Sequence, residues 1–344
     1  MTKMKDHCLN LAALFGLLQW SEVSAGSGDI NLMVVGDWGG VPFPPYSTPG
    51  QRAVAASMGR VATDISASAV LALGDNFYFD GIRTDATNYR FENTWNSVYS
   101  DPSLQVPWYL IAGNHDHYGN VTAQLEFTDV SERWNFPALY HQKSFASDDS
   151  LLTLDVVFID TVDLAGASMI TDENDPRYYD KLPYRPKAAA ATQWDWIEEQ
   201  LKASTADFLI VAGHYPMYSV CEHGATSNLI ENLRPLLIQY GAHYMAGHDH
   251  CMVSTTDENN LLYIVTGAGN TCCTKADRYD EVPPDYLDWY VSRENKPKTN
   301  PRLIGGFSSL TATKDGVKIM FYDQEGNELY ATQSVPPRAK ATAK

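Results

Sequence analysis

The chain has 344 residues, of which 44% are hydrophobic and 19% are charged. This composition excludes a disordered or fibrous protein, and the length allows one large domain or two modest ones at roughly 100–200 residues per domain. Asp and Glu number 42 against 25 Lys and Arg, so the net charge is −17. Such a surface repels nucleic-acid backbones and anionic membranes, and we expect neither as an electrostatic partner.

Residues 1–25 have the pattern of a secretory signal peptide. A basic start precedes an apolar run over 9–18, and small residues at 23–25 provide a cleavage site. The run is shorter than the roughly 20 residues that a membrane-spanning helix needs. The alternative is an ordinary N-terminal helix. A signal peptide predicts a secreted or lysosomal protein, in which the sequon at Asn120 is a plausible glycosylation site.

Five short apolar runs recur along the chain, and each ends in a glycine that a polar residue follows. Runs of four or five apolar residues are typical of strands covered on both faces. Helical periodicity lies between them, over 54–65, 194–201 and 229–237, with Pro235 expected to kink the last helix. Strands that alternate with helices indicate an α/β fold. The five runs are Leu32–Val35, Val70–Leu73, Trp108–Ala112, Phe208–Ala212 and His243–Ala246.

The C-terminal part changes character. Residues 303–330 have a strand-like composition, with turn signals at 315–316 and 325–327, which predicts antiparallel hairpins. No Pro- or Ser-rich linker divides the chain, so we expect a single catalytic domain over 26–334. The basic stretch 335–344 is predicted to be a flexible tail.

The polar residues that follow the five runs indicate a metal site. Functional groups of open α/β sheets collect beyond the carboxyl ends of the strands. One Gly-Asp after a strand is usually only a turn, but five polar strand ends in chain order are hard to explain by turns alone. Their oxygen and imidazole ligands suit a hard trivalent ion beside a borderline divalent ion. The candidate ligands are Asp37, Asp75, Tyr78, Asn114, His214, His248 and His250.

The spacing of His248 and His250 adds an expectation about the last strand end. In an extended segment, positions i and i+2 face the same way, so both histidines would reach the site. Asp249 between them would face elsewhere and orient the loop. Two metals about 3.5–4 Å apart would clamp the attacking and leaving oxygens of a phosphoryl transfer.

The five strand ends resemble, in order, the five motifs of the metallophosphoesterase superfamily. Tyr78, three residues after Asp75, narrows the resemblance to purple acid phosphatases, and the short chain is similar to their mammalian-type, tartrate-resistant branch. The resemblance covers about residues 31–330. The motifs are Gly36-Asp37-Trp38-Gly39, Gly74-Asp75-Asn76-Phe77-Tyr78, Gly113-Asn114-His115-Asp116, Gly213-His214-Tyr215-Pro216 and Gly247-His248-Asp249-His250.

The resemblance implies an α/β fold in which a sandwich of two sheets is flanked by helices, in four layers. It also implies two metal ions, with Asp75 bridging them. The ferric ion, Fe3+, would be held by Asp37, Asp75, Tyr78 and His250. The second ion, Fe2+ or in its place Zn2+ or Mn2+, would be held by Asp75, Asn114, His214 and His248.

The resemblance further implies hydrolysis of phosphate monoesters at acid pH, by attack of a metal-bound hydroxide. His115 and His223 match the family's substrate-contacting histidines. Protonated below about pH 6.5, they would attract phosphate and assist the leaving group. Substrates would be small phosphate esters or phosphoproteins, and the enzyme a monomer. The alternatives are a phosphodiesterase of the same superfamily and a non-catalytic secreted protein on the same fold.

The cysteines depart from the family pattern. The disulfide of mammalian-type relatives would fall here on Ala165 and Asn228, so that bridge is absent. We expect a replacement bridge from Cys251 to one of the adjacent pair 272–273, with buried reduced thiols as the alternative. Four cysteines follow the signal peptide and allow three pairings: Cys221, Cys251, Cys272 and Cys273.

Residues 163–187 form a long stretch rich in Asp, Pro and Tyr, with little periodicity. Relatives have an exposed, protease-sensitive loop here that restrains activity. The resemblance therefore implies an activating protease as a partner. A merely variable surface loop is the alternative.

Overall fold

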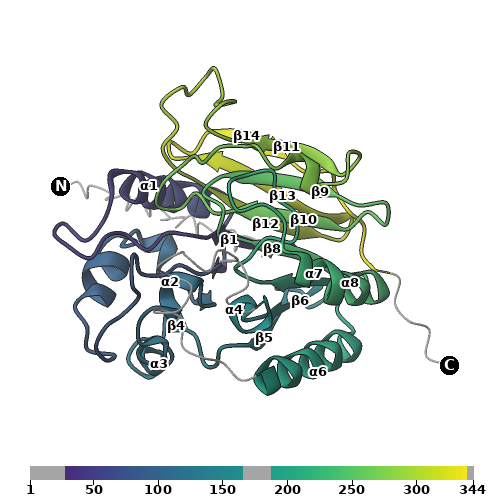
Figure 1. The fold of residues 1–344 in the computed structure, drawn as a ribbon, viewed down its shortest axis with the longest axis horizontal. Coiled ribbons are helices and arrows are strands. Elements are labelled where there is room, and N and C mark those ends of the chain that lie inside the picture. Colours follow the sequence, from purple (N-terminus) through teal and green to yellow (C-terminus); the bar gives the residue numbers. More distant parts are fainter. Residues whose placement is uncertain (1–27, 166–186, 339–344) are drawn as a thin grey trace, which may run out of the picture.

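The computed structural model describes residues 28–165 and 187–338, which form two mixed seven-stranded sheets packed face to face (Figure 1). The predicted signal peptide and most of the stretch 163–187 lie outside the described residues. The first sheet has the order β14-β13-β12-β1-β2-β3-β4, and the second has the order β11-β9-β10-β8-β7-β6-β5. The strands are β1 Ile30–Val35, β2 Ala69–Ala72, β3 Trp108–Leu110, β4 Trp134–Asn135, β5 His141–Ala146, β6 Thr153–Phe158, β7 Phe208–Ala212, β8 His243–Ala246, β9 Met252–Thr256, β10 Leu262–Thr266, β11 Leu287–Val291, β12 Gly306–Thr313, β13 Gly316–Asp323 and β14 Glu328–Ala331.

Helices cover the outer face of each sheet. Helix α1 contributes Val54 and Met58 to a core with the first sheet, and α6 contributes Ile197 and Leu201 to a core with the second. The predicted four-layer α/β/β/α architecture is confirmed. The helices are α1 Pro49–Asp64, α2 Asn114–His117, α3 Val121–Glu126, α4 Thr161–Ala165, α6 Lys187–Ala203, α7 Ser227–Asn232 and α8 Arg234–Tyr240. Among the described residues, none of these helices is long and apolar enough to cross a membrane.

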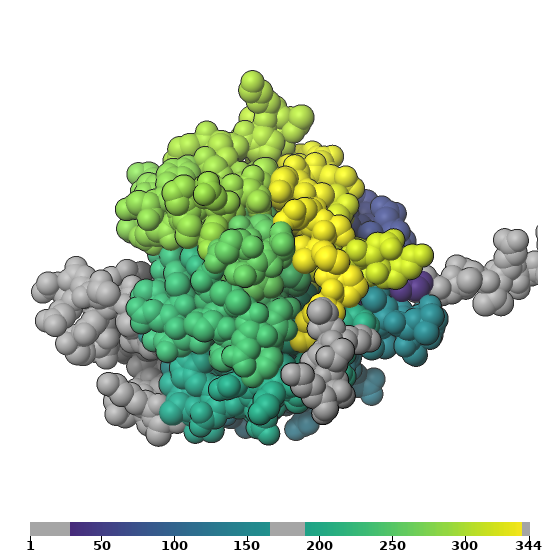
Figure 2. Space-filling model, turned by 90° about the vertical axis from the view of Figure 1, so that its right-hand side faces the viewer, coloured from purple at the N-terminus to yellow at the C-terminus, as the bar shows by residue number. Residues whose placement is uncertain are grey.

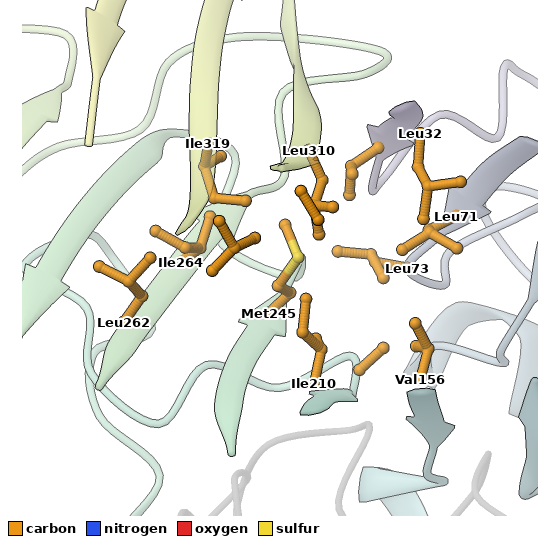
Figure 3. Packing of buried hydrophobic residues seen from close by; sticks show 14 of the residues in the cluster. Leu32, Leu71, Leu73, Val156, Ile210, Met245, Leu262, Ile264, Leu310 and Ile319 are labelled. Atoms are coloured by element: carbon orange, nitrogen blue, oxygen red, sulfur yellow. The ribbon is translucent and has the colours of Figure 1, made fainter. Parts of the chain in front are cut away.

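The central core lies between the two sheets (Figure 3). Leu32 and Leu71 of the first sheet face Ile210 and Met245 of the second, and all four side chains are at most 1% exposed. Because both faces of β1, β2, β7 and β8 are covered, these strands are apolar over most of their length, as four of the five runs predicted.

Parallel pairing brings the predicted site residues to one edge of the molecule. Strands β1 to β4 are parallel to one another, as are β6, β7, β8 and β10. The two sheets meet at the carboxyl ends of these strands, where the Gly36 N–H donates to the Thr266 carbonyl at 3.0 Å. The strand ends of both sheets therefore face one another.

The expected helix over 229–237 is broken rather than kinked. Helix α7 ends at Asn232 and α8 begins at Arg234, with Pro235 in its first turn, where the missing N–H costs nothing. The predicted hairpins are confirmed, because β12, β13 and β14 pair antiparallel in sequence.

The first residues of the predicted flexible tail are bonded to the domain. Val335 pairs with Val317, and the Arg338 guanidinium donates to the carbonyls of Ser204, Ala206 and Tyr240 at 2.8–3.1 Å. Tyr240 is the last residue of α8 and Ser204 follows α6, so the cation lies at two helix C-termini, which carry partial negative charge. Figure 2 shows this segment, in yellow, on the surface beside the green part of the chain.

We predict that Arg338→Ala lowers the free energy of unfolding by about 2 kcal/mol and the melting temperature by about 5 °C, because charged hydrogen bonds to partly buried carbonyls are lost. Thermal denaturation followed by circular dichroism measures this. Arg302→Ala, at an exposed position, serves as the control. An unchanged melting temperature for Arg338→Ala would show that the clamp contributes nothing.

Two core histidines make stability depend on pH. Burial lowers the pKa of His141 and of His243 to about 4, whereas an unfolded histidine titrates near about 6.5. The unfolded chain therefore binds more protons between these values, and the free energy of unfolding falls as the pH drops through this window.

We predict that the free energy of unfolding of His243→Asn falls less steeply as the pH drops, because this variant has one buried histidine fewer. Its amide oxygen can still accept the Leu262 N–H. Urea denaturation at a series of pH values measures the slope, and equal slopes for the two chains would contradict the prediction.

Candidate metal centre

Three candidate ligands form one half of the site. The Tyr78 hydroxyl lies 2.9 Å from His250 Nε2 and 3.1 Å from Asp37 Oδ1. Nε2 of His250 lies 3.6 Å from the same carboxylate oxygen. Ligand atoms of Asp37, Asp75 and His250 all lie within 4.8 Å of one another.

The other half consists of an amide and two imidazoles. His214 Nε2 lies 3.1 Å from Asn114 Oδ1 and 3.4 Å from Asp75 Oδ1. The His248 ring lies beside the His214 ring, with 5.1 Å between the centroids. Asp75 thus contacts both halves, in the position that a bridging ligand would take.

Glycines make this convergence possible by close approach rather than by positive φ alone. A Cβ on Gly247 would lie 2.4 Å from Asp37 Oδ2, and one on Gly113 would lie 2.2 Å from Asp75 Oδ1. Any side chain at these positions would displace the carboxylates. The glycine before each strand-end residue is therefore required sterically.

The ligand residues themselves make the sharp turns. Asp37, Asp75 and His248 have φ values of 57°, 52° and 69°, in the left-handed region that non-glycine residues seldom adopt. The expectation of an extended segment from His248 to His250 is therefore wrong. His248 turns into the site through this left-handed conformation, which also directs its N–H to Asp37 Oδ2 at 2.6 Å.

The electrostatics of the site call for cations. Burial, followed by the charges of Asp37 and Asp75, raises the pKa of Tyr78 well above its ordinary value. Burial also opposes ionisation of Asp75, but His214 and His115 outweigh it and lower the pKa of Asp75. A phenolate at Tyr78 would thus need a strong Lewis acid beside it.

The donor atoms fit metal ions. His214 Nδ1 donates to the Leu73 carbonyl at 2.8 Å, so the lone pair of a neutral ring would be on Nε2, which faces the Asn114 and Asp75 oxygens. The lone pairs of His214 Nε2, Asn114 Oδ1 and Asp75 Oδ1 would repel one another, and only a proton or a metal ion between these three atoms removes the repulsion. Burial lowers the pKa of His248, which keeps it neutral, and its buried Nε2 has no hydrogen-bond partner among the described residues. Neutral imidazole is the form that binds metals.

The two candidate catalytic histidines lie beside different ligands of this centre. His115 Nδ1 donates to the Phe79 carbonyl at 2.6 Å, and its Nε2 lies 3.9 Å from Asp75 Oδ2. The His223 ring lies over His248, with 4.2 Å between the centroids. The structure thus brings all nine predicted site residues together.

Sequence reasoning assigned no role to Asp116, which organises the loops that follow β2 and β3 of the first sheet. Its carboxylate is fully buried and accepts the N–H groups of Asn76, Phe77 and Gly113 at 2.8–3.2 Å. These bonds hold the turns that present Asp75, Tyr78 and Asn114. The available signal was a carboxylate three residues after Gly113, at the start of a helix.

Thr161 was also missed. It follows β6, and its hydroxyl accepts the N–H groups of His214 and Tyr215 at 3.2 and 3.0 Å. The end of β6 thereby fixes the turn after β7. No pattern around Thr161 distinguishes it from an ordinary threonine, because its role depends on a contact across 53 residues.

The expected bridge from Cys251 to the 272–273 pair is wrong. Cys221 pairs with Cys251, and Cys272 pairs with its neighbour Cys273. The reason lies in the position of the loop that follows β7, which places Cys221 beside Cys251 within the second sheet's outer core. The alternative of reduced thiols does not hold for any of the four.

The chain belongs to the calcineurin-like phosphoesterase family, whose model matches residues 30–252. Its curated relatives are acid phosphatases of the tartrate-resistant and purple type, so the predicted resemblance and enzyme class are confirmed. Tartrate-resistant acid phosphatase type 5 of Oryctolagus cuniculus is 39% identical, over 94% of this chain and 96% of the relative. The Homo sapiens protein of the same name is 36% identical, over 96% and 98%. Purple acid phosphatase 17 of Arabidopsis thaliana is 32% identical, over 91% and 87%.

Solved structures share the fold. "GAP50 the anchor in the inner membrane complex of Plasmodium" has a TM-score of 0.72 at 22% identity, covering 91% of this chain and 90% of that one. A dimetal phosphatase from Danio rerio has a TM-score of 0.54 at 14% identity, covering 89% and 99%. At these identities the likeness concerns the fold alone.

We predict that Gly113→Ala lowers the metal content of the purified protein, because the added methyl group would occupy the space of Asp75 Oδ1. Elemental analysis by mass spectrometry measures metal per chain. Gly28→Ala is the control, since its Cβ would meet its nearest neighbour at an ordinary 3.4 Å. Metal content equal to that of the original chain would contradict the role given to Asp75.

Proposed function

We propose that this chain is a secreted or lysosomal acid phosphatase that hydrolyses phosphate monoesters at a binuclear metal site. The observation that carries the proposal is the convergence of seven candidate ligands where the two sheets meet, with His214 Nε2 facing two oxygens. Family membership supports it, because the curated relatives are acid phosphatases over nearly the whole chain.

The two halves of the site suggest the assignment of the metals. When bound, the pair of ions would hold the phosphate and activate a water molecule for attack on phosphorus. The harder, oxygen-rich half suits Fe3+, and the half with two imidazoles and an amide suits Fe2+, Zn2+ or Mn2+. Fe3+ would be held by Asp37, Asp75, Tyr78 and His250. The second ion would be held by Asp75, Asn114, His214 and His248.

His115 and His223 would serve the leaving group. The Phe79 carbonyl fixes His115 Nδ1 as a donor, so its Nε2 faces Asp75 and the site. A protonated Nε2 there would donate to the ester oxygen as the P–O bond breaks. His223 approaches from the side of His248 and would contact the phosphate from that direction.

The disulfides and the glycosylation sequon bear on where in the cell the protein is found. Two disulfides suit an oxidising compartment, which supports secretion or a lysosomal location. Asn120 is exposed, as a glycosylation site requires. We propose small phosphate esters or phosphoproteins as substrates, a monomeric enzyme and an activating protease. The proposed cleavage falls largely within residues 166–186, outside the described residues.

We predict that Asn114→Ala and His214→Ala each lower kcat/KM for p-nitrophenyl phosphate by more than about 100-fold, beyond the usual effect of residues outside the ligand set. Steady-state kinetics at acid pH on metal-loaded protein measures this. His243→Asn is the matched control, because His243 is a buried histidine at the start of β8 whose Nδ1 accepts the Leu262 N–H. Retained activity in Asn114→Ala or His214→Ala would reject the assignment.

The alternatives have separate outcomes. Faster turnover of bis(p-nitrophenyl) phosphate than of the monoester would favour a phosphodiesterase. Metal binding without turnover of either ester would favour a non-catalytic protein on the same fold. An absorption band in the green-to-yellow region, from tyrosinate bound to ferric iron, would support iron in the half that contains Tyr78.

A further inference from the structure

Asp249 lies between two candidate metal ligands but is directed away from them. It is fully buried, and its Oδ1 accepts the backbone N–H of His223 at 2.9 Å. The loop 247–250 therefore has two functions. It presents His248 and His250 to the metal centre, and through the side chain of Asp249 it holds the candidate catalytic residue His223.

A covalent bond adds to this contact. The Cys221–Cys251 disulfide joins the residue two positions before His223 to the residue directly after His250. Both cysteines are fully buried, so the bond is shielded from solvent. The loop that contains His223 is thus tied twice to the segment 249–251.

Further contacts brace the same loop from the outside. Cys221 forms a β-bridge with Ala276, and Glu281 Oε2 accepts the Ala225 N–H at 2.8 Å. The Thr274 N–H donates to the His250 carbonyl at 3.0 Å. One segment, 274–281, therefore supports both the His223 loop and the end of the loop 247–250. The position of His223 over His248 is fixed by contacts remote from its ring.

We propose that Asp249 and the Cys221–Cys251 disulfide are positioning elements that hold His223 over His248, in the orientation that receives a phosphate ester. The inference rests on the proposed function, since it assigns His223 to that reaction. Asp249 and Cys251 are also neighbours of the candidate ligands His248 and His250 in the chain, and we assign their effect to the position of His223 rather than to those ligands.

The test is a double-mutant cycle with p-nitrophenyl phosphate. Asp249→Ala should lower kcat/KM roughly 10- to 100-fold, with metal content unchanged. Asp249→Asn should restore most of it, because the amide oxygen can still accept the His223 N–H. In a His223→Ala chain, Asp249→Ala should have no further effect. An equal loss in both backgrounds, or loss of metal with activity, would overturn the proposal.

A second arm covers a folding failure. If Asp249→Ala does not fold, Cys221→Ser combined with Cys251→Ser replaces it in the same cycle, with the same expectations. Asp323→Ala is the matched control, since Asp323 is a buried carboxylate that accepts the N–H groups of Glu325 and Asn327 away from the site. It should lower the melting temperature and leave kcat/KM unchanged.

Phosphate binding separates this inference from the proposed function. If the original chain binds metal but hydrolyses no ester, the proposed function fails. The cycle is then read by calorimetric titration of inorganic phosphate into the metal-loaded chains. Asp249→Ala should raise the Kd for inorganic phosphate roughly tenfold in the original chain, and should leave it unchanged in the His223→Ala chain. Equal weakening in both would reject the positioning role.

Discussion

The site depends on a contact between backbones of the two sheets. Gly36 and Gly247 end strands of different sheets, and a Cβ on Gly36 would lie 3.0 Å from the Gly247 Cα. At this separation the Asp37 carboxylate reaches the His248 N–H, and the Gly36 N–H reaches Thr266. A bulkier residue at either glycine would push the sheets apart at the point where the candidate ligands converge. The close approach of Gly36 and Gly247 is therefore required both for packing of the two sheets and for the geometry of the site.

Charge is concentrated where the sheets meet. Four carboxylates, those of Asp37, Asp75, Asp116 and Asp249, are at most 1% exposed. Burial raises the pKa of Asp116 to about 6, with a further contribution from Asp75. The net charge of −17 would repel phosphate, but two bound cations would reverse the field inside the site while leaving the surface acidic. The proposed metal ions would thus neutralise the carboxylates that the fold buries at this position.

The sequence predicted what short-range patterns encode. Apolar runs ending in Gly and a polar residue predicted the five strands and the set of strand-end side chains, because parallel strands end at one edge. The four layers were implied by the family resemblance and not by the runs themselves. The sequence could not give the Cys221–Cys251 pairing, the His223–Asp249 bond or the clamp by Arg338, each of which joins segments that local patterns do not relate. The left-handed backbone at Asp37, Asp75 and His248 was also not predicted, because the preference of Asp and His for this conformation is too weak to single out these positions.

The distribution of the candidate ligands along the chain has a consequence for assembly. Asp37, Asp75, Tyr78 and Asn114 come from the first sheet, whereas His214, His248 and His250 come from the second. Neither half of the centre is complete within one sheet. During synthesis, the last histidine emerges more than two hundred residues after the first aspartate, so ions with the proposed coordination would enter only after both sheets have formed and packed. Metal loading would then be a late step that reports a finished fold.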